Sequence, residues 1–260
     1  MLPKLQKKFS TQRHAFKLYT SLSVLFIILQ IECILSVHKQ ISIFNVDLTI
    51  SGIIYPFNLL ILGIITNSYG YQYARQLLWL NNLALIQFII YNFIIFHLNP
   101  SLAMQIHQPD LVQSYNILVP LYIKSSISSM VSENIANFIF IWMINISKIL
   151  QHGKKIGWRI MKYSVLANFI MLIIAYSVIF FNRYTVLHIL KLIIDVMLIK
   201  TAIELFFLYF AVYCARKLRE YEGVEVFDYS KNNPFTLLVN YEYLNILENL
   251  KETNESNSNK

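Results

Sequence analysis

Charged residues are scarce in this 260-residue chain: Asp, Glu, Lys and Arg make up 14% of it, against 56% hydrophobic residues. This scarcity excludes an ordinary water-soluble domain, because one core of this size cannot hide so much apolar surface. Part of the protein must therefore face lipid. A membrane β-barrel is excluded as well, since the apolar runs are unbroken and lack the alternation of barrel strands. The sequence predicts an all-α polytopic membrane protein.

Motifs that perform chemistry are also missing. The chain contains no GxSxG, HExxH or P-loop sequence and no paired-carboxylate arrangement, so we expect no catalytic residues and no cofactor. Its six histidines are scattered and predict no metal site. The two cysteines, Cys33 and Cys214, fall near opposite membrane faces in the topology below, which argues against a disulfide. An enzyme is therefore the weakest class of function.

Six apolar runs are long enough to cross a bilayer, which takes roughly 20 residues. They are 18–37, 46–66, 77–98, 117–146, 163–181 and 186–214. The fourth and sixth exceed one crossing and predict tilted or kinked helices, with Pro56 and Pro120 as kink sites. We expect three regions: a basic N-terminus over 1–17, a six-helix transmembrane domain over 18–214, and an acidic, partly disordered tail over 215–260.

The distribution of positive charge predicts the orientation. With six spans, seventeen of the 22 Lys and Arg residues lie on one side, and only Lys39 and Arg183 lie on the other. By the positive-inside rule both termini are cytoplasmic, in a cell inner (plasma) membrane. The net charge of +8 then reflects topology and attraction to anionic lipid. The expected partner is the lipid bilayer, and no nucleic-acid partner is predicted.

Ionisable residues within the spans are costly in lipid and mark places to look for function. Lys191 and Asp195 are four residues apart, as are Lys200 and Glu204, so each pair shares one helical face. Two interpretations stay open. Each pair neutralises itself against a neighbouring helix, or the pairs line a substrate or ion path. Glu133 is a further candidate.

The last 41 residues form an acidic segment. Residues 220–260 contain eight acids and three bases. Within them one amphipathic face is approximated by Leu237, Leu238, Tyr241, Leu244 and Leu247. This pattern predicts docking on the loops of the protein or on a cytoplasmic protein partner.

One stretch resembles a known family. Residues 55–79 read YPFNLLILGIITNSYGYQYARQLLW, with an aromatic-Pro pair, a Tyr-Gly, a basic turn ending in Ala-Arg and an aromatic residue opening the next helix. This is similar to the signature of the queuosine precursor transporter family, also called the vitamin uptake transporter family. Trp158, Arg159 and Ser164 occupy places similar to later family motifs. The resemblance implies a six-helix bundle similar to the substrate-binding membrane subunits of energy-coupling-factor importers.

The departures from the family pattern concern its polar residues. On this alignment the family's acids fall on Gly63, Asn67, Ala136 and Met171, and its two glutamines fall on Glu133 and Asn168. The motif residues that support the helix arrangement are kept, whereas the polar residues that would recognise substrate in the family are replaced. The resemblance therefore implies a divergent member with another substrate or a non-transport role.

The leading hypothesis is uptake of a small-molecule substrate, a planar queuosine precursor-like deazapurine or a related nucleobase or vitamin, through a cavity near the midplane. The predicted substrate-binding residues are polar or aromatic positions within the spans: Asn58, Asn67, Trp79, Asn82, Glu133, Asn137, Trp142 and Asn168. For each Asn the alternative is helix packing through an interhelical hydrogen bond, worth about 0.6 kcal/mol. The alternative function is a non-transporting membrane interaction protein that acts through its tail.

Overall fold

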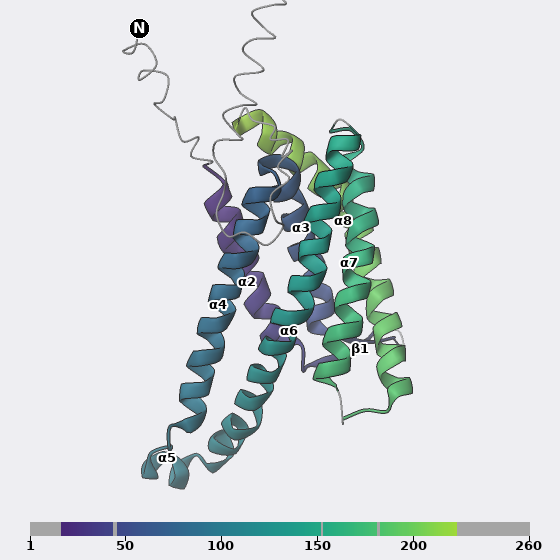
Figure 1. The fold of residues 1–260 in the computed structure, drawn as a ribbon. Helices are drawn as coiled ribbons and strands as arrows, with labels where there is room; N and C mark the ends of the chain where they lie inside the picture. The colour runs from purple at the N-terminus through teal and green to yellow at the C-terminus, as the bar shows by residue number, and fades with distance from the viewer. Residues whose placement is uncertain (1–16, 44–45, 152, 181–182, 223–260) are drawn as a thin grey trace, which may run out of the picture.

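The computed structural model describes residues 17–43, 46–151, 153–180 and 183–222. Six long helices form the bundle in Figure 1: α2 (Tyr19–Ser36), α3 (Ile50–Tyr69), α4 (Tyr71–His97), α6 (Pro109–Leu150), α7 (Ile156–Ile179) and α8 (Val186–Glu222). A short helix, α5 (Leu102–His107), connects α4 to α6. Strands β1 (Gln40–Ile43) and β2 (Val46–Thr49) pair antiparallel as a hairpin between α2 and α3.

The prediction of an all-α polytopic membrane protein is confirmed. Five described helices, α2, α3, α4, α6 and α7, are long and apolar enough to cross a membrane. The sixth predicted span falls within α8, which is 37 residues long and packs against α3 and α7. In Figure 1, α8 runs the length of the bundle beside α7.

Helix α3 is the central element of the bundle. It contacts α2, α4, α6, α7 and α8, and 72% of its spanning window is buried. Its glycines permit close approach: a Cβ at Gly63 would lie 3.3 Å from the Ile160 side chain of α7, and one at Gly52 would lie 3.0 Å from Val196 of α8. Gly63 is one of the positions that the family alignment assigns to an acid, and here the α7 side chain occupies that space.

Both ends of the described chain meet at one end of the bundle. The backbone N–H groups of Lys17 and Leu18 donate to the Glu222 carboxylate at 3.3 and 3.0 Å. The tight α3–α4 turn at Gly70, whose φ of 89° favours glycine, lies at this end, as does the α6–α7 connection (Figure 1). We call it the basic end. Since the described chain starts and finishes here, it crosses the bundle an even number of times.

Several helix boundaries differ from the predicted spans. Residues 46–49 were expected in the second span, but they form β2, and α3 begins at Ile50 after the Thr49 side chain accepts a hydrogen bond from the Gly52 N–H at 3.3 Å. Helix α6 has 42 residues, about 63 Å at 1.5 Å per residue, which is longer than any single crossing needs. Figure 1 shows α4 and the first part of α6 extending beyond the other helices, with α5 at the tip.

The predicted basic N-terminus and most of the predicted tail, including its amphipathic face, lie outside the described residues. The division into three regions therefore remains a prediction for those parts.

Candidate functional site

Polar side chains from several helices meet inside the bundle, and we call them the central polar cluster. The cluster draws on five helices, and its members are Gln30 of α2, Tyr55 and Asn58 of α3, Glu133 and Asn137 of α6, Ser164 and Asn168 of α7, and Lys200 and Glu204 of α8. Every one of these side chains is buried. Because burial of polar groups is costly without hydrogen bonds, the bonds inside the cluster decide what it can do.

The α8 pair of the cluster is held by neighbouring helices. Glu204 accepts hydrogen bonds from the Ser164 hydroxyl at 2.6 Å and the Asn168 amide at 2.7 Å, both from α7. The Lys200 ammonium faces the ring of Tyr55 at 4.0 Å, a cation–π contact. Within the described residues these two charges form no ion pair with each other. Each charge of the pair instead has its direct contacts on a neighbouring helix, Glu204 with α7 and Lys200 with α3.

The other charge pair of α8 is also not joined. Lys191 is exposed, and the Asp195 carboxylate has one buried oxygen that accepts no hydrogen bond within the described residues. Spacing of four residues thus brought neither pair into contact.

Four buried atoms of the central polar cluster have unused hydrogen-bonding capacity. Asn58 donates to Gln30 at 2.8 Å, and Tyr55 donates to Asn137 at 3.1 Å. In the described part of the chain, however, no hydrogen bond of good geometry is found for Gln30 Nε2, Asn58 Oδ1, Glu133 Oε2 or Asn168 Oδ1, although Gln30 and Ser129 lie close enough to Glu133 to favour its charged form. Unsatisfied buried polar atoms are rare in native proteins and call for an explanation. Of these four residues, Glu133 lines the small cavity that adjoins the cluster.

A small cavity adjoins the cluster. It has a volume of about 20 Å³ and is lined by Glu133 and Lys200 together with Ser51, Tyr55, Ser129 and Tyr176, among others. A volume of this size holds about one water molecule. The structure is therefore closed around the cluster, and a larger ligand enters only when the helices separate.

The structure brings half of the predicted site residues together. Asn58, Glu133, Asn137 and Asn168 belong to the central polar cluster, as described above. Gln30, Tyr55 and Ser164 were not among the predicted site residues. Gln30 could have been found as a polar residue inside the first apolar run. Tyr55 and Ser164 were noted only as family-motif positions, and their contacts with Lys200 and Glu204 on another helix are seen only in the fold.

The other four predicted residues lie elsewhere. Asn82 of α4 donates to Asn134 of α6 at 2.9 Å, so it forms the interhelical packing bond that was the alternative to substrate binding. Trp79 meets Phe138 edge-to-face with ring centroids 6.1 Å apart. Trp142 is 49% exposed on the bundle surface. Asn67 lies at the basic end, nine residues or about 13 Å along α3 from Asn58.

Asn67 is the centre of a second polar group. Its side-chain oxygen accepts from Arg159 Nη2 at 2.6 Å and Nε at 3.2 Å. Its backbone carbonyl accepts from Lys148 Nζ at 2.6 Å and Arg219 Nη2 at 2.8 Å. We call Lys148, Arg159 and Arg219 the basic-end cluster. Three helices, α6, α7 and α8, thus direct cations at one neutral residue of α3.

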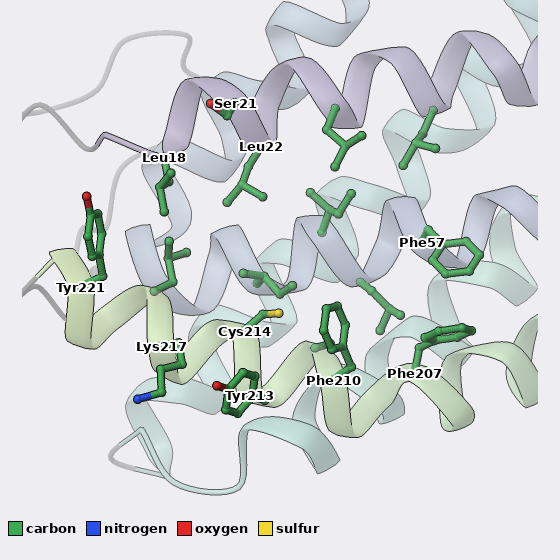
Figure 2. A pocket seen from close by; sticks show the side chains of 17 residues that line it. Leu18, Ser21, Leu22, Phe57, Phe207, Phe210, Tyr213, Cys214, Lys217 and Tyr221 are labelled. Atoms are coloured by element: carbon green, nitrogen blue, oxygen red, sulfur yellow. The ribbon is translucent and has the colours of Figure 1, made fainter.

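A large apolar groove lies on the side of the bundle. Figure 2 shows it between α2 and α8, with Phe57, Phe207 and Phe210 along its walls and Lys217 and Tyr221 near one end. Its volume is about 670 Å³ and its walls are almost wholly carbon. It offers few groups to recognise a polar base, so we place the candidate substrate site at the central polar cluster. Among the described residues, no group of three His, Cys, Asp or Glu side chains is arranged to hold a metal ion.

Comparison with known proteins gives one match. A family model described as "Putative vitamin uptake transporter" matches residues 49–214. This range contains α3, α4, α6, α7 and most of α8, and so every member of the central polar cluster except Gln30. No curated protein and no solved structure matches the chain.

Proposed function

The chain belongs to the vitamin uptake transporter family, and from this premise we propose that it moves a small planar metabolite across the membrane by way of the central polar cluster. Family membership supports a small-molecule substrate and a place in the membrane. The choice of substrate class and of binding residues is our inference.

The observation that supports this site is the set of four buried polar atoms with unused hydrogen-bonding capacity. Three acceptors, on Asn58, Glu133 and Asn168, suit ring N–H and amino groups, and the Gln30 donor suits a carbonyl or ring nitrogen. A queuosine precursor-like deazapurine, or a related nucleobase or vitamin, presents such an edge. Each buried group left unsatisfied costs roughly 1–3 kcal/mol, so a ligand that satisfies them gains both affinity and selectivity.

The closed cavity indicates how such a protein works. A space of about 20 Å³ cannot hold a base, so substrate enters after the helices part and is released by a similar opening on the other side. Alternating exposure of a fixed midplane site is the usual mechanism of secondary transporters.

We place the basic end in the cytoplasm. Lys17, Arg75, Lys154 and Lys155 lie at this end in addition to the basic-end cluster, and positive charge favours the cytoplasmic side. Contact between Leu18 and Glu222 supports the location of both ends of the described chain on that side.

The test is thermal stabilisation of the purified full-length protein by a panel of nucleobases, deazapurines and vitamins. A ligand at one hundred times its Kd adds about 2.7 kcal/mol to the folded state. We expect one planar compound to raise the Tm of the wild type and of Glu32→Gln, whose carboxylate is exposed on α2. We expect no shift for Glu133→Gln, in which an acceptor is replaced by an amide. A flat response of the wild type, or an equal shift in both variants, would overturn the proposed site.

A further inference from the structure

The apolar groove is a second hollow, separate from the central polar cluster. Helices α2 and α8 both pack against α3, and one face of α3 forms the floor of the groove between them (Figure 2). The floor residues are Phe57, Leu60, Ile61 and Ile64. On the walls, Leu25 of α2 is 45% and Phe210 of α8 is 62% exposed. Three apolar helix faces thus enclose a groove that opens on the side of a membrane bundle, where the surrounding medium is lipid.

The groove has the length of one bilayer leaflet. Its lining runs from Leu18 to Leu29 along α2 and from Phe207 to Tyr221 along α8. At 1.5 Å per residue these distances are about 17 and 21 Å. Half a bilayer is about 15 Å of hydrocarbon, or about 20–22 Å with its headgroup region. One end of the groove lies at the basic end, and the other lies beside Gln30 of the central polar cluster, which follows Leu29 in the chain. The groove therefore extends from one membrane surface to the level of that cluster.

The width of the groove suits a hydrocarbon chain. A volume of about 670 Å³ spread over about 21 Å gives a mean cross-section of about 32 Å². A helix with its side chains is 10–12 Å across and has a cross-section of about 80–110 Å². Carbon atoms of neighbouring hydrocarbon chains pack about 4 Å apart, so a chain needs far less room than a helix. An acyl chain fits inside the groove, whereas a helix from a partner or a second copy enters it only in part.

The mouth of the groove at the basic end carries charges of both signs. Lys217 lines the groove and pairs with Glu220, Nζ to Oε2 at 2.8 Å, and the two side chains are 59% and 65% exposed. The Lys17 ammonium lies 5.9 Å from the ring of Tyr221, another lining residue. Exposed ion pairs contribute little to stability, so a phosphate can replace Glu220 at Lys217 and an amine can replace Lys217 at Glu220. A headgroup with one phosphate and one primary amine matches this mouth, whereas a headgroup with negative charge alone brings an anion against Glu220.

We propose that the apolar groove binds a phospholipid with an ethanolamine headgroup. An acyl chain lies along the α3 floor, the phosphate contacts Lys217 and Lys17, and the amine contacts Glu220. With the basic end in the cytoplasm, as proposed above, this lipid belongs to the inner leaflet. The chain fills the space between α2 and α8, which carry Gln30 and Glu204 of the central polar cluster, and so it sets the spacing of two helices that contribute to that cluster. Lipid binding itself does not depend on transport.

The test is native mass spectrometry of the full-length protein released from detergent micelles. The protein is titrated with phosphatidylethanolamine, phosphatidylglycerol or phosphatidylcholine, all with the same acyl chains. We expect one tightly bound phosphatidylethanolamine per protein, with a Kd at least fivefold below the Kd of each of the other two lipids. The substitution Cys214→Trp fills the groove and should raise that Kd at least fivefold. The matched control is Leu205→Trp at a 61% exposed position of α8 outside the groove lining, and it should leave the Kd unchanged.

Substitutions of the exposed charges test the headgroup contacts and keep the test decisive if Cys214→Trp fails to fold. Lys217→Gln removes a phosphate contact and should weaken binding of all three lipids. Glu220→Gln removes the amine contact and should abolish the preference for phosphatidylethanolamine. Arg216→Gln, which replaces an exposed cation of the same helix outside the groove lining, should change neither the affinity nor the preference.

Three results would overturn the proposal. One is binding of several lipids with equal affinity and no preference, and another is tighter binding of phosphatidylglycerol than of phosphatidylethanolamine. The third is the mass of a dimer, or of an accompanying polypeptide, that is lost in Cys214→Trp and kept in Leu205→Trp, since the groove would then hold a second copy or a partner helix. Because no substrate is involved, these results separate a failure of lipid binding from a failure of the proposed transport function.

Discussion

Replacement of Asn67 by alanine should cost more stability than replacement of any other single asparagine discussed above. Its side chain accepts two hydrogen bonds from the buried Arg159 guanidinium and donates to the Gly63 carbonyl at 2.7 Å. Bonds to a charged partner contribute about 1.5–3 kcal/mol each and a neutral bond about 1 kcal/mol. Arg159 keeps its bond to the Lys154 carbonyl, so we expect a net loss of about 2–4 kcal/mol in the free energy of unfolding.

The assay is equilibrium unfolding of the purified protein in mixed micelles, followed by circular dichroism. The matched control is Asn82→Ala, which removes one bond between two neutral amides, worth about 0.6 kcal/mol in a membrane. Asn67→Asp should lose less stability than Asn67→Ala, because its carboxylate still accepts from Arg159 and forms an ion pair with it, although the hydrogen bond to the Gly63 carbonyl is lost. A loss below about 1 kcal/mol for Asn67→Ala, or one equal to that of Asn82→Ala, would refute the role given to this residue.

Three further results are expected. Gly63→Ala places a Cβ 3.3 Å from the Ile160 side chain, so overpacking should lower the free energy of unfolding by about 1–3 kcal/mol. Thermal unfolding checks this through a second substitution, Ile160→Ala, which should lower stability less in the Gly63→Ala variant than in the wild type. Burial lowers the pKa of His38 from its ordinary 6.5, so the unfolded chain binds the proton more readily. Protonation of His38 therefore does not lower the free energy of unfolding above about pH 6.5, and lowers it progressively as the pH falls below that value. In the His38→Gln variant the free energy of unfolding should depend less on pH between about pH 5 and 7 than in the wild type. Tyr55→Phe keeps a ring beneath the Lys200 ammonium and Tyr55→Leu does not, so the leucine variant should unfold at a lower Tm, by an amount equivalent to about 2 kcal/mol; equal Tm values would argue against the cation–π contact.

The positions of the long helices were predictable from the sequence, and their ends were not. The thickness of the bilayer sets the length of a spanning apolar run at about 20 residues, so each run coincides over most of its length with a helix. A helix continues past the apolar run wherever local propensity allows, as α6 does from Pro109 and α8 does to Glu222. The Thr49 side chain caps α3 and marks the start of this helix, four residues inside the predicted span.

The candidate site was only partly predictable, because its contacts lie between helices. Sequence spacing placed Lys200 and Glu204 on one face, but it gave no information on Tyr55 or on the α7 donors Ser164 and Asn168 that contact them. Likewise, Asn67 and Asn58 looked alike as polar residues in one apolar run. The cations that gather around Asn67 come from segments 81 to 152 residues later in the chain, and only the fold brings them there.

The central claim is transport through the central polar cluster, and uptake tests it most directly. The compound that most stabilises the protein is supplied in radiolabelled form to proteoliposomes containing wild type, Glu133→Gln or Glu32→Gln at matched protein levels. We predict saturable uptake by the wild type and Glu32→Gln, reduced at least tenfold in Glu133→Gln, which corresponds to about 1.4 kcal/mol. Equal uptake by all three, or binding by the wild type without uptake into the liposomes, would contradict the account.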